Sequence, residues 1–270
     1  MTSNERELAY RYDLFITPDW RDRFDMLIDE NIKMPTEGRI LDVNSGTGAH
    51  AIELAERMRG NGEVIALDPS AERIELARAK ALVKNVEEVI FEQAGALPLR
   101  FADREFDGVI GDASMLRACD VEPLLRELVR VAELDAPVVL KLATRGSFDE
   151  FFSIYWEALH DVGIDEPVWA RLEALINERP TISEAEQMGE RAGLRGLQNF
   201  WSKEEFAFES GEAFLDSPLI KDNFLDEWLA IIAAERRDDV RRRIAEIIDR
   251  ERQDVDFEMS IKATLIAGHR

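Results

Sequence analysis

The chain has 270 residues, and its 34 basic and 56 acidic side chains give it a formal charge of −22. Apolar residues make up 46% of the chain and charged residues 33%, a globular composition that excludes an intrinsically disordered protein. A field this negative repels polyanions, so the charge argues against a nucleic-acid partner and against docking on an anionic membrane surface.

The first half of the sequence has the pattern of an α/β protein. The first 35 residues are expected to be helical, because apolar residues from Trp20 to Ile28 recur at helical spacing and Pro35 closes the segment. Short apolar strands then alternate with amphipathic helices, which indicates parallel βαβ units with helices on both faces of the sheet. The expected strands are 39–44, 63–68, 88–92, 106–111 and 137–143, and the expected helices are 49–59, 71–84 and 121–134.

Later in the chain the sequence favours helices. Ser183 and Glu186 have the spacing of a capping box at the start of a helix, and Ser217 followed by Pro218 is typical of another helix start. Because there is no linker and no internal repeat, a single domain over 1–270 is expected. Further helices are expected at 148–159, 167–177 and 236–252, strand-like pieces within 195–208, and a long strand at 257–267.

The segment ILDVNSGTGAH at 40–50 joins an apolar strand to a helix through a glycine-rich turn. Gly46 and Gly48 allow a close approach of the backbone to a ligand, and the free N–H groups of the helix start favour electron-rich ligand groups. Asp68 ends the second strand, where a carboxylate can accept hydrogen bonds from both hydroxyls of a ribose. A tight turn without a ligand and an N-cap acid are the plainer interpretations. The spacing also fits a dinucleotide site, so these residues indicate a nucleoside without identifying it.

Asp42 separates the two classes of cofactor. It lies four residues before Gly46, at the end of the first strand. An anion there would face the pyrophosphate of a dinucleotide, whereas it suits a cationic ligand that carries an ammonium and a sulfonium group.

Five segments, in this order and spacing, resemble the class I S-adenosylmethionine-dependent methyltransferases: ILDVNSGTG, VIALDPS, AGALPL, EFDGVI and LLRELVRVAELDAPVVLKLA, over about 38–145. The resemblance implies an α/β, Rossmann-like fold with a seven-stranded, mostly parallel sheet of order 3-2-1-4-5-7-6 and helices on both faces. Its sixth strand is expected near 196–201, and its seventh, antiparallel strand at 257–267. The implied parts are an N-terminal helical lid (1–37), a cofactor-binding half (38–145) and a C-terminal half (146–270) with a helical insertion at about 211–254 before the last strand.

The resemblance also implies S-adenosylmethionine as the cofactor and assigns residues to it. Asp42 and Gly46 would hold the methionine part, Asp68 the ribose, and Pro69 would pack on the adenine. Two positions depart from the family pattern. Asn44 replaces the first glycine, and asparagine tolerates left-handed backbone angles; Gln93 replaces an acid near the adenine amino group, and its carbonyl can accept the same bond. The cofactor-binding candidates are Asp42, Asn44, Gly46, Gly48, Asp68, Pro69, Gln93, Ala94 and Asp112.

The catalytic residues are less clearly marked. Methyl transfer from a sulfonium is an in-line displacement that needs alignment and exclusion of water, and a base only where a proton must leave early. Asp112 and His160 are the candidates for a base, although His160 is also explained as a cation at a helix end. His50 is expected to be a local structural or cofactor-edge residue, and Lys141 to extend to the solvent end of its strand. With Cys119 as the single cysteine, no metal site is expected.

Aromatic residues mark two candidate covers. Before the first strand, Tyr10, Tyr12, Phe15 and Trp20 would either fold over the cofactor or pack on the sheet's helices. Phe214, Phe224 and Trp228 of the insertion would line a pocket or, as the simpler interpretation, form core.

The function indicated is methyl transfer from S-adenosylmethionine to a small-molecule acceptor, without a nucleic-acid or membrane partner. A non-catalytic protein that binds S-adenosylmethionine or S-adenosylhomocysteine, as a sensor or assembly partner, is the alternative. A nicotinamide-dependent oxidoreductase is a third interpretation, which Asp42 disfavours. No apolar signal core and no stretch of about 20 apolar residues is present, which favours a cytoplasmic location.

Overall fold

The computed structural model describes residues 3–164, 167–251 and 255–270. The chain divides into two compact units, each described by itself here. The first comprises Met1–Ala143, Thr181–Trp201 and Ala263–Arg270, and the second comprises Thr144–Pro180 and Ser202–Lys262. The organisation of 1–270 as one domain stays a prediction.

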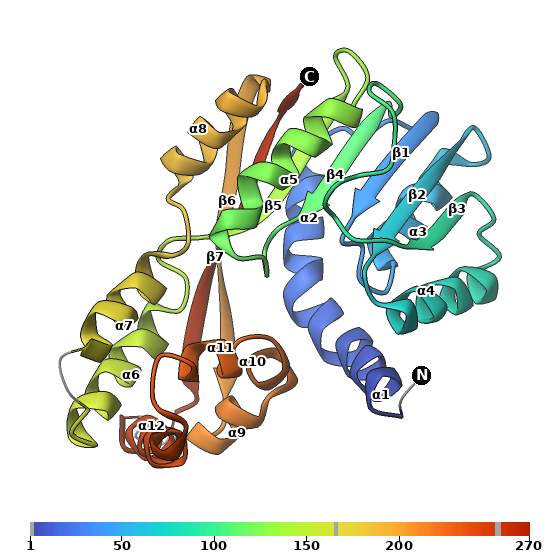
Figure 1. Ribbon diagram of the computed structural model, residues 1–270. Coiled ribbons are helices and arrows are strands. Elements are labelled where there is room, and N and C mark those ends of the chain that lie inside the picture. Colours follow the sequence, from blue (N-terminus) through green and yellow to red (C-terminus); the bar gives the residue numbers. More distant parts are fainter. Residues whose placement is uncertain (1–2, 165–166, 252–254) are drawn as a thin grey trace. The chain divides into compact units, whose positions relative to one another are not determined.

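A seven-stranded sheet has the order β3-β2-β1-β4-β5-β7-β6, which confirms the expected topology (Figure 1). Its central pairs β1–β2, β1–β4, β2–β3 and β4–β5 are parallel. Strand β7 runs the other way, because Arg270 donates to the carbonyl of Ala136 before β5, and Thr144 at the end of β5 donates to Lys262. The strands are β1 (Gly38–Val43), β2 (Gly62–Asp68), β3 (Val89–Gln93), β4 (Gly108–Asp112), β5 (Pro137–Thr144), β6 (Arg195–Phe208) and β7 (Phe257–His269).

Helices of the first unit cover both faces of the sheet. On one face, Leu41 and Val43 of β1 share a buried apolar cluster with the Leu124 and Leu128 side chains of α5. Because successive side chains of a strand point to opposite faces, Asp42 between them faces the other side, where α2 and α3 lie. The helices of this unit are α1 (Ser3–Arg11), the π-helix η1 (Tyr12–Arg21), α2 (Asp22–Asn31), α3 (Ala49–Met58), α4 (Ala71–Lys84), α5 (Ala118–Val131) and α8 (Ile182–Ala192).

The N-terminal segment is helical as expected, but it is not a plain α-helix. It is π-helical over Tyr12–Arg21, and the amide of Asp22 donates to the carbonyl of Thr17 five residues earlier. Pro18 lies within this stretch, and a proline removes one donor of the regular i to i−4 ladder. Widened turns of this kind are frequent at functional sites.

Two expectations about the later elements need correction. The capping box of α8 is made by Thr181 and Glu184, two residues earlier than the Ser183 and Glu186 pair. Thr181 satisfies the same spacing, and the helix begins directly after it at Ile182. The sixth strand is one continuous strand and is longer than the expected 196–201.

The second unit is built around aromatic side chains. Phe214, Phe224 and Trp228 are buried, and Trp228 stacks on Phe151 of α6 with 4.2 Å between ring centroids. These residues are therefore core of this unit. Residues 252–254, at the end of the expected insertion, lie outside the described ones. The helices are α6 (Asp149–Asp161), α7 (Pro167–Asn177), α9 (Gly211–Asp216), α10 (Pro218–Asn223), α11 (Leu225–Leu229), the 3₁₀-helix η2 (Ala234–Arg236) and α12 (Arg237–Glu251).

Across the described ranges, no helix is both long enough and apolar enough to cross a membrane.

Candidate functional site

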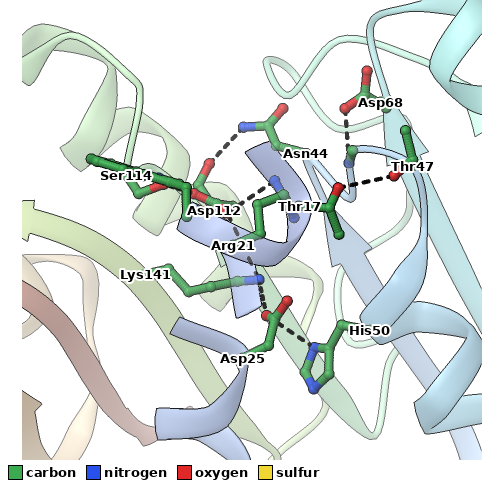
Figure 2. A network of polar contacts seen from close by, with 12 residues as sticks. Thr17, Arg21, Asp25, Asn44, Thr47, His50, Asp68, Asp112, Ser114 and Lys141 are labelled. Carbon is green, nitrogen blue, oxygen red and sulfur yellow. Dashed lines mark hydrogen bonds and ion pairs between the residues drawn. The ribbon is translucent and has the colours of Figure 1, made fainter. Parts of the chain in front are cut away.

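The glycine-rich turn after β1 has the backbone conformation that its sequence predicts. Asn44, Gly46 and Gly48 have positive φ angles of 60°, 62° and 76°. The Asn44 amide donates to the carbonyl of Asp112 at 2.8 Å, so its side chain also ties the turn to the end of β4. The departure from glycine at this position is therefore accommodated, with one added hydrogen bond (Figure 2).

Asp42 lies beneath this turn as a buried acid. It is 0% exposed, and neither of its carboxylate oxygens accepts a hydrogen bond from any residue that the structure describes. Burial raises the pKa of Asp42, against the opposing charges of Lys141 and Arg21. A buried carboxylate without a donor is costly, so this position suits a ligand that brings a cationic or N–H group.

Asp68, at the end of β2, is already bound to its own chain. Its Oδ2 accepts the Gly46 amide at 3.0 Å, its Oδ1 accepts the Ser70 amide at 2.9 Å, and Arg73 pairs with it at 3.2 Å. Burial raises the pKa of Asp68, opposed first by the charge of Arg73. Asp68 thus holds the turn in shape. A carboxylate has about four acceptor positions, so ribose hydroxyls would compete with Arg73, and the ribose assignment stays a prediction.

The remaining cofactor candidates group at the ends of β2 and β3. Gln93 is exposed, and its amide nitrogen donates to the carbonyl of Pro69 at 3.1 Å, which leaves its side-chain oxygen available as an acceptor. The Ala94 amide donates to the carbonyl of Asp68 at 3.1 Å. Their contacts with an adenine stay predictions.

A stripe of polar residues on the N-terminal helical segment faces this site. Thr17, Arg21, Asp25 and Asp29 are each four residues apart, so they lie along one face of the segment. The Thr17 and Thr47 hydroxyls are 3.2 Å apart, and the other three side chains make ion pairs across the site. Figure 2 shows the first three of them beside their partners Thr47, Asp112 and Lys141.

Arg21 and Asp112 form a buried ion pair at the end of β4, with Nη1 to Oδ2 at 3.0 Å. The other oxygen of Asp112 accepts hydrogen bonds from the amide and hydroxyl of Ser114, at 2.8 and 2.6 Å. The Trp20 indole donates to the same hydroxyl at 2.9 Å. Ser114 thus holds one oxygen of Asp112, whereas Oδ2 faces the Arg21 guanidinium without accepting a hydrogen bond from a described residue. Because this oxygen faces a positive charge, the residue is better placed to bind or orient than to remove a proton.

The expectation for Lys141 is wrong. Its side chain is 0% exposed and ends on Asp25 at 2.5 Å, with Asp112 at 3.8 Å. Burial alone would lower the pKa of Lys141, but the acids around it, Asp25 foremost, raise it overall. The lysine lies on the face of the sheet that α2 covers, and its ammonium group pairs there with Asp25 and does not extend to solvent.

His50 links α3 to α2, which fits the structural role that was one of its two expected roles. Its ring nitrogens lie 3.4 Å from Asp25 and 3.4 Å from Asp29, so both face carboxylates of α2. Burial lowers the pKa of His50, but the charge of Asp25 and the hydrogen bond with Asp29 outweigh it, and the net pKa lies above 6.5. The charge of Lys141 also lowers the pKa of His50, and the charge of Asp42 also raises it.

The raised pKa of His50 predicts a pH-dependent stability. The folded protein holds this proton more tightly than the unfolded chain, so the contribution is full below about pH 6.5 and is lost as pH rises through the raised folded pKa. Urea unfolding of the protein at pH 6 and pH 9 should therefore show a smaller loss in His50→Gln than in the unmodified chain. His160→Gln, with its side chain 69% exposed, is the matched control. Equal losses in the unmodified chain and His50→Gln would contradict the assignment.

The other residues expected near the cofactor separate into two groups. Tyr12 and Trp20 are buried, whereas Tyr10 and Phe15 are 51% and 45% exposed, and a role of this segment as a lid stays a prediction. His160 lies in the second unit, at the end of α6, where it stacks on Trp156 and neighbours Asp161. Its catalytic role stays a prediction.

Sequence reasoning missed Thr17, Arg21, Asp25 and Arg73. The four-residue spacing of the polar stripe was a usable signal, because it places four polar residues along one face of the segment. The lysine within the apolar strand PVVLKLA was another, since a buried cation needs an acid. Arg73 gave no signal, because an arginine in the first turn of an exposed helix is ordinary.

Comparison with known proteins agrees with this fold. The methyltransferase domain family matches residues 40–134. The demethylmenaquinone methyltransferase of Thermus thermophilus is 35% identical over 162 residues, which cover 56% of this chain and 70% of that protein. A ubiquinone/menaquinone biosynthesis C-methyltransferase of Geotalea daltonii is 30% identical over 156 residues, which cover 55% of this chain and 65% of that protein.

Solved structures share the fold at low sequence identity. The YcgJ protein of Bacillus subtilis has a TM-score of 0.57 at 21% identity, covering 92% of this chain and 98% of that one. Phosphoethanolamine N-methyltransferase 2 of Haemonchus contortus, solved with S-adenosylhomocysteine, has a TM-score of 0.57 at 14% identity, covering 97% and 57%. The chain belongs to the class I S-adenosylmethionine-dependent methyltransferase family. It is an enzyme, and S-adenosylmethionine is its cofactor.

Proposed function

We propose that this methyltransferase acts on a small-molecule acceptor and holds its cofactor at the carboxyl ends of β1, β2 and β4. The observation that carries the placement is Asp42, whose buried carboxylate has no donor among the described residues. The ammonium and sulfonium groups of S-adenosylmethionine supply the complementary charge. Gly46 follows in the turn, and the side chains of Tyr12 and Arg21 lie where a side chain at position 46 would be, so a ligand that approaches this backbone would contact both of them.

When bound, the cofactor would supply a methyl group on a positively charged sulfur. An electron pair of the acceptor would form the new bond as the carbon–sulfur bond breaks, and sulfur would keep the electrons of the broken bond. Where the acceptor atom is a ring carbon, the proton of that carbon must then leave to a base or to water. Asp42 and Asp68 would hold the amino-acid part and the ribose of the cofactor, while the buried Trp20 and Phe24 of the N-terminal segment exclude water from the first unit's network.

The small-molecule acceptor is supported by charge and by relatives. A formal charge of −22 disfavours a nucleic acid. Relatives that align with more than half of this chain are named as demethylmenaquinone and ubiquinone/menaquinone methyltransferases, so a reduced quinone ring is the first acceptor to test. Transfer of labelled methyl to such rings would support this class, and transfer to RNA or DNA instead would contradict it.

Asp68→Ala tests the placement of the cofactor. Loss of charge-assisted hydrogen bonds to the ribose should weaken S-adenosylhomocysteine binding by about 10–100-fold, measured by calorimetric titration. Glu72→Ala removes a carboxylate from the first turn of the same helix, α4, and should leave the affinity within about threefold. Unchanged binding in Asp68→Ala would show that the site is elsewhere. Binding of NAD in place of S-adenosylhomocysteine would contradict the cofactor class.

A further inference from the structure

We infer that Arg21 binds the carboxylate of the cofactor's amino-acid end and so selects ligands that carry this group. The inference rests on the cofactor placement proposed above. It concerns a residue of the N-terminal segment, outside the glycine turn and the strand ends from which the family resemblance drew the binding candidates.

The guanidinium of Arg21 is buried, and only part of its hydrogen-bonding capacity is satisfied. The residue is 6% exposed, and Nη1 makes both of its contacts, with Asp112 Oδ2 at 3.0 Å and the Tyr12 hydroxyl at 3.2 Å. Within the described part of the chain, Nε and Nη2 donate to no acceptor. These two nitrogens form one planar edge of the guanidinium, and such an edge matches the two oxygens of a carboxylate.

This unused edge lies against the glycine turn. A Cβ added to Gly46 would come within 3.2 Å of Arg21 Nε and 3.0 Å of the Tyr12 ring. Arg21 and Tyr12 therefore occupy the space that a side chain at position 46 would take, and a ligand bound against the turn would contact the arginine directly. Tyr12 supports it through the hydroxyl, and the guanidinium of Arg73 stacks over the Tyr12 ring at 4.6 Å.

Arg21 and Asp42 together complement an amino acid. Arg21 offers two nitrogens that donate to no described residue. Asp42 offers two carboxylate oxygens that accept no hydrogen bond from a described residue. The α-carboxylate and α-ammonium groups of the cofactor would meet opposite charges on the two sides of the same turn. Asp112 is not left unpaired if Arg21 shifts, because Ser114 donates to it twice and Lys141 lies 3.8 Å away.

The test compares two ligands that differ only at this end. S-adenosylhomocysteine carries the amino-acid group, and 5′-methylthioadenosine has the same nucleoside and sulfur without it. Calorimetric titration of Arg21→Gln should show about 10–100-fold weaker binding of S-adenosylhomocysteine, with 5′-methylthioadenosine within about threefold of the unmodified protein. Binding of the second ligand also shows that the site is folded.

Arg23→Gln is the matched control, because position 23 is two residues further along α2 and so lies on roughly the opposite face of the helix. If Arg21→Gln does not fold, Arg21→Lys decides: it keeps the charge but loses the planar edge, so S-adenosylhomocysteine alone should weaken. An equal loss for both ligands, or no loss, would overturn the inference while leaving the proposed function standing. Failure of the unmodified protein to bind either ligand would instead reject the proposed cofactor placement.

Discussion

Lys141→Met is expected to lower the free energy of unfolding by about 3–5 kcal/mol, because it removes one partner of a buried ion pair. The ammonium of Lys141 ends 2.5 Å from Asp25, and its side chain is fully buried. Methionine keeps much of the volume, so the loss reports charge and not a cavity. Equilibrium unfolding in urea measures it. The pair joins the N-terminal segment to β5, so the same variant should also loosen that segment.

Two further variants make this expectation specific. Lys84→Met removes a lysine whose side chain is 49% exposed and should change stability by no more than about 0.5 kcal/mol. The double variant Asp25→Leu with Lys141→Met should lose less than the two single losses added together, because it removes both charges of the pair. If Lys141→Met had the same free energy of unfolding as Lys84→Met, the assignment of a buried ion pair would be contradicted.

Gly48→Ala is expected to cost about 2–4 kcal/mol through backbone strain and overpacking. Gly48 has a φ of 76°, and a Cβ there would lie 2.4 Å from the Phe91 ring and 2.9 Å from Ala77. The ring belongs to β3 and the alanine to α4, and neither can retreat without moving its element. Thermal and urea unfolding would both record the loss.

Gly95→Ala is the control for this substitution. Gly95 follows β3, and a Cβ added there would meet no atom within 4 Å. Its stability should stay within about 0.5 kcal/mol of the unmodified protein. If the two alanine variants were equally stable, the packing of the glycine turn against β3 and α4 would be wrong.

The sheet could be predicted because its signals are local. Apolar runs such as VIALD, bounded by turn residues, define a strand by themselves, and the resemblance to the methyltransferase family implied the spatial order of the strands. The positions of Gly46 and Asp68 at the strand ends follow from the same pattern. The left-handed backbone conformation at Asn44 could also be predicted, since few other non-glycine residues tolerate it.

The polar network beneath the turn could not be predicted in the same way. Lys141 and Asp25 are 116 residues apart in sequence, and their pairing depends on how α2 lies across the sheet. A local pattern says that a buried lysine needs an acid but not which acid supplies it. The π-helical stretch at Tyr12–Arg21 adds a second obstacle, because it alters the angle at which each later side chain leaves the helix. The N-terminal contribution to the site therefore emerges only from tertiary packing.

Amide hydrogen exchange of the full chain, with and without S-adenosylhomocysteine, tests the location of the cofactor site most directly. The proposed site predicts slower exchange in the bound protein at three places: the turn at 44–50, the end of β2 near Asp68, and the segment around Arg21. The amides of the second unit, such as those of α7, should change less. Protection confined to other parts of the chain, with the turn at 44–50 unchanged, would contradict the site.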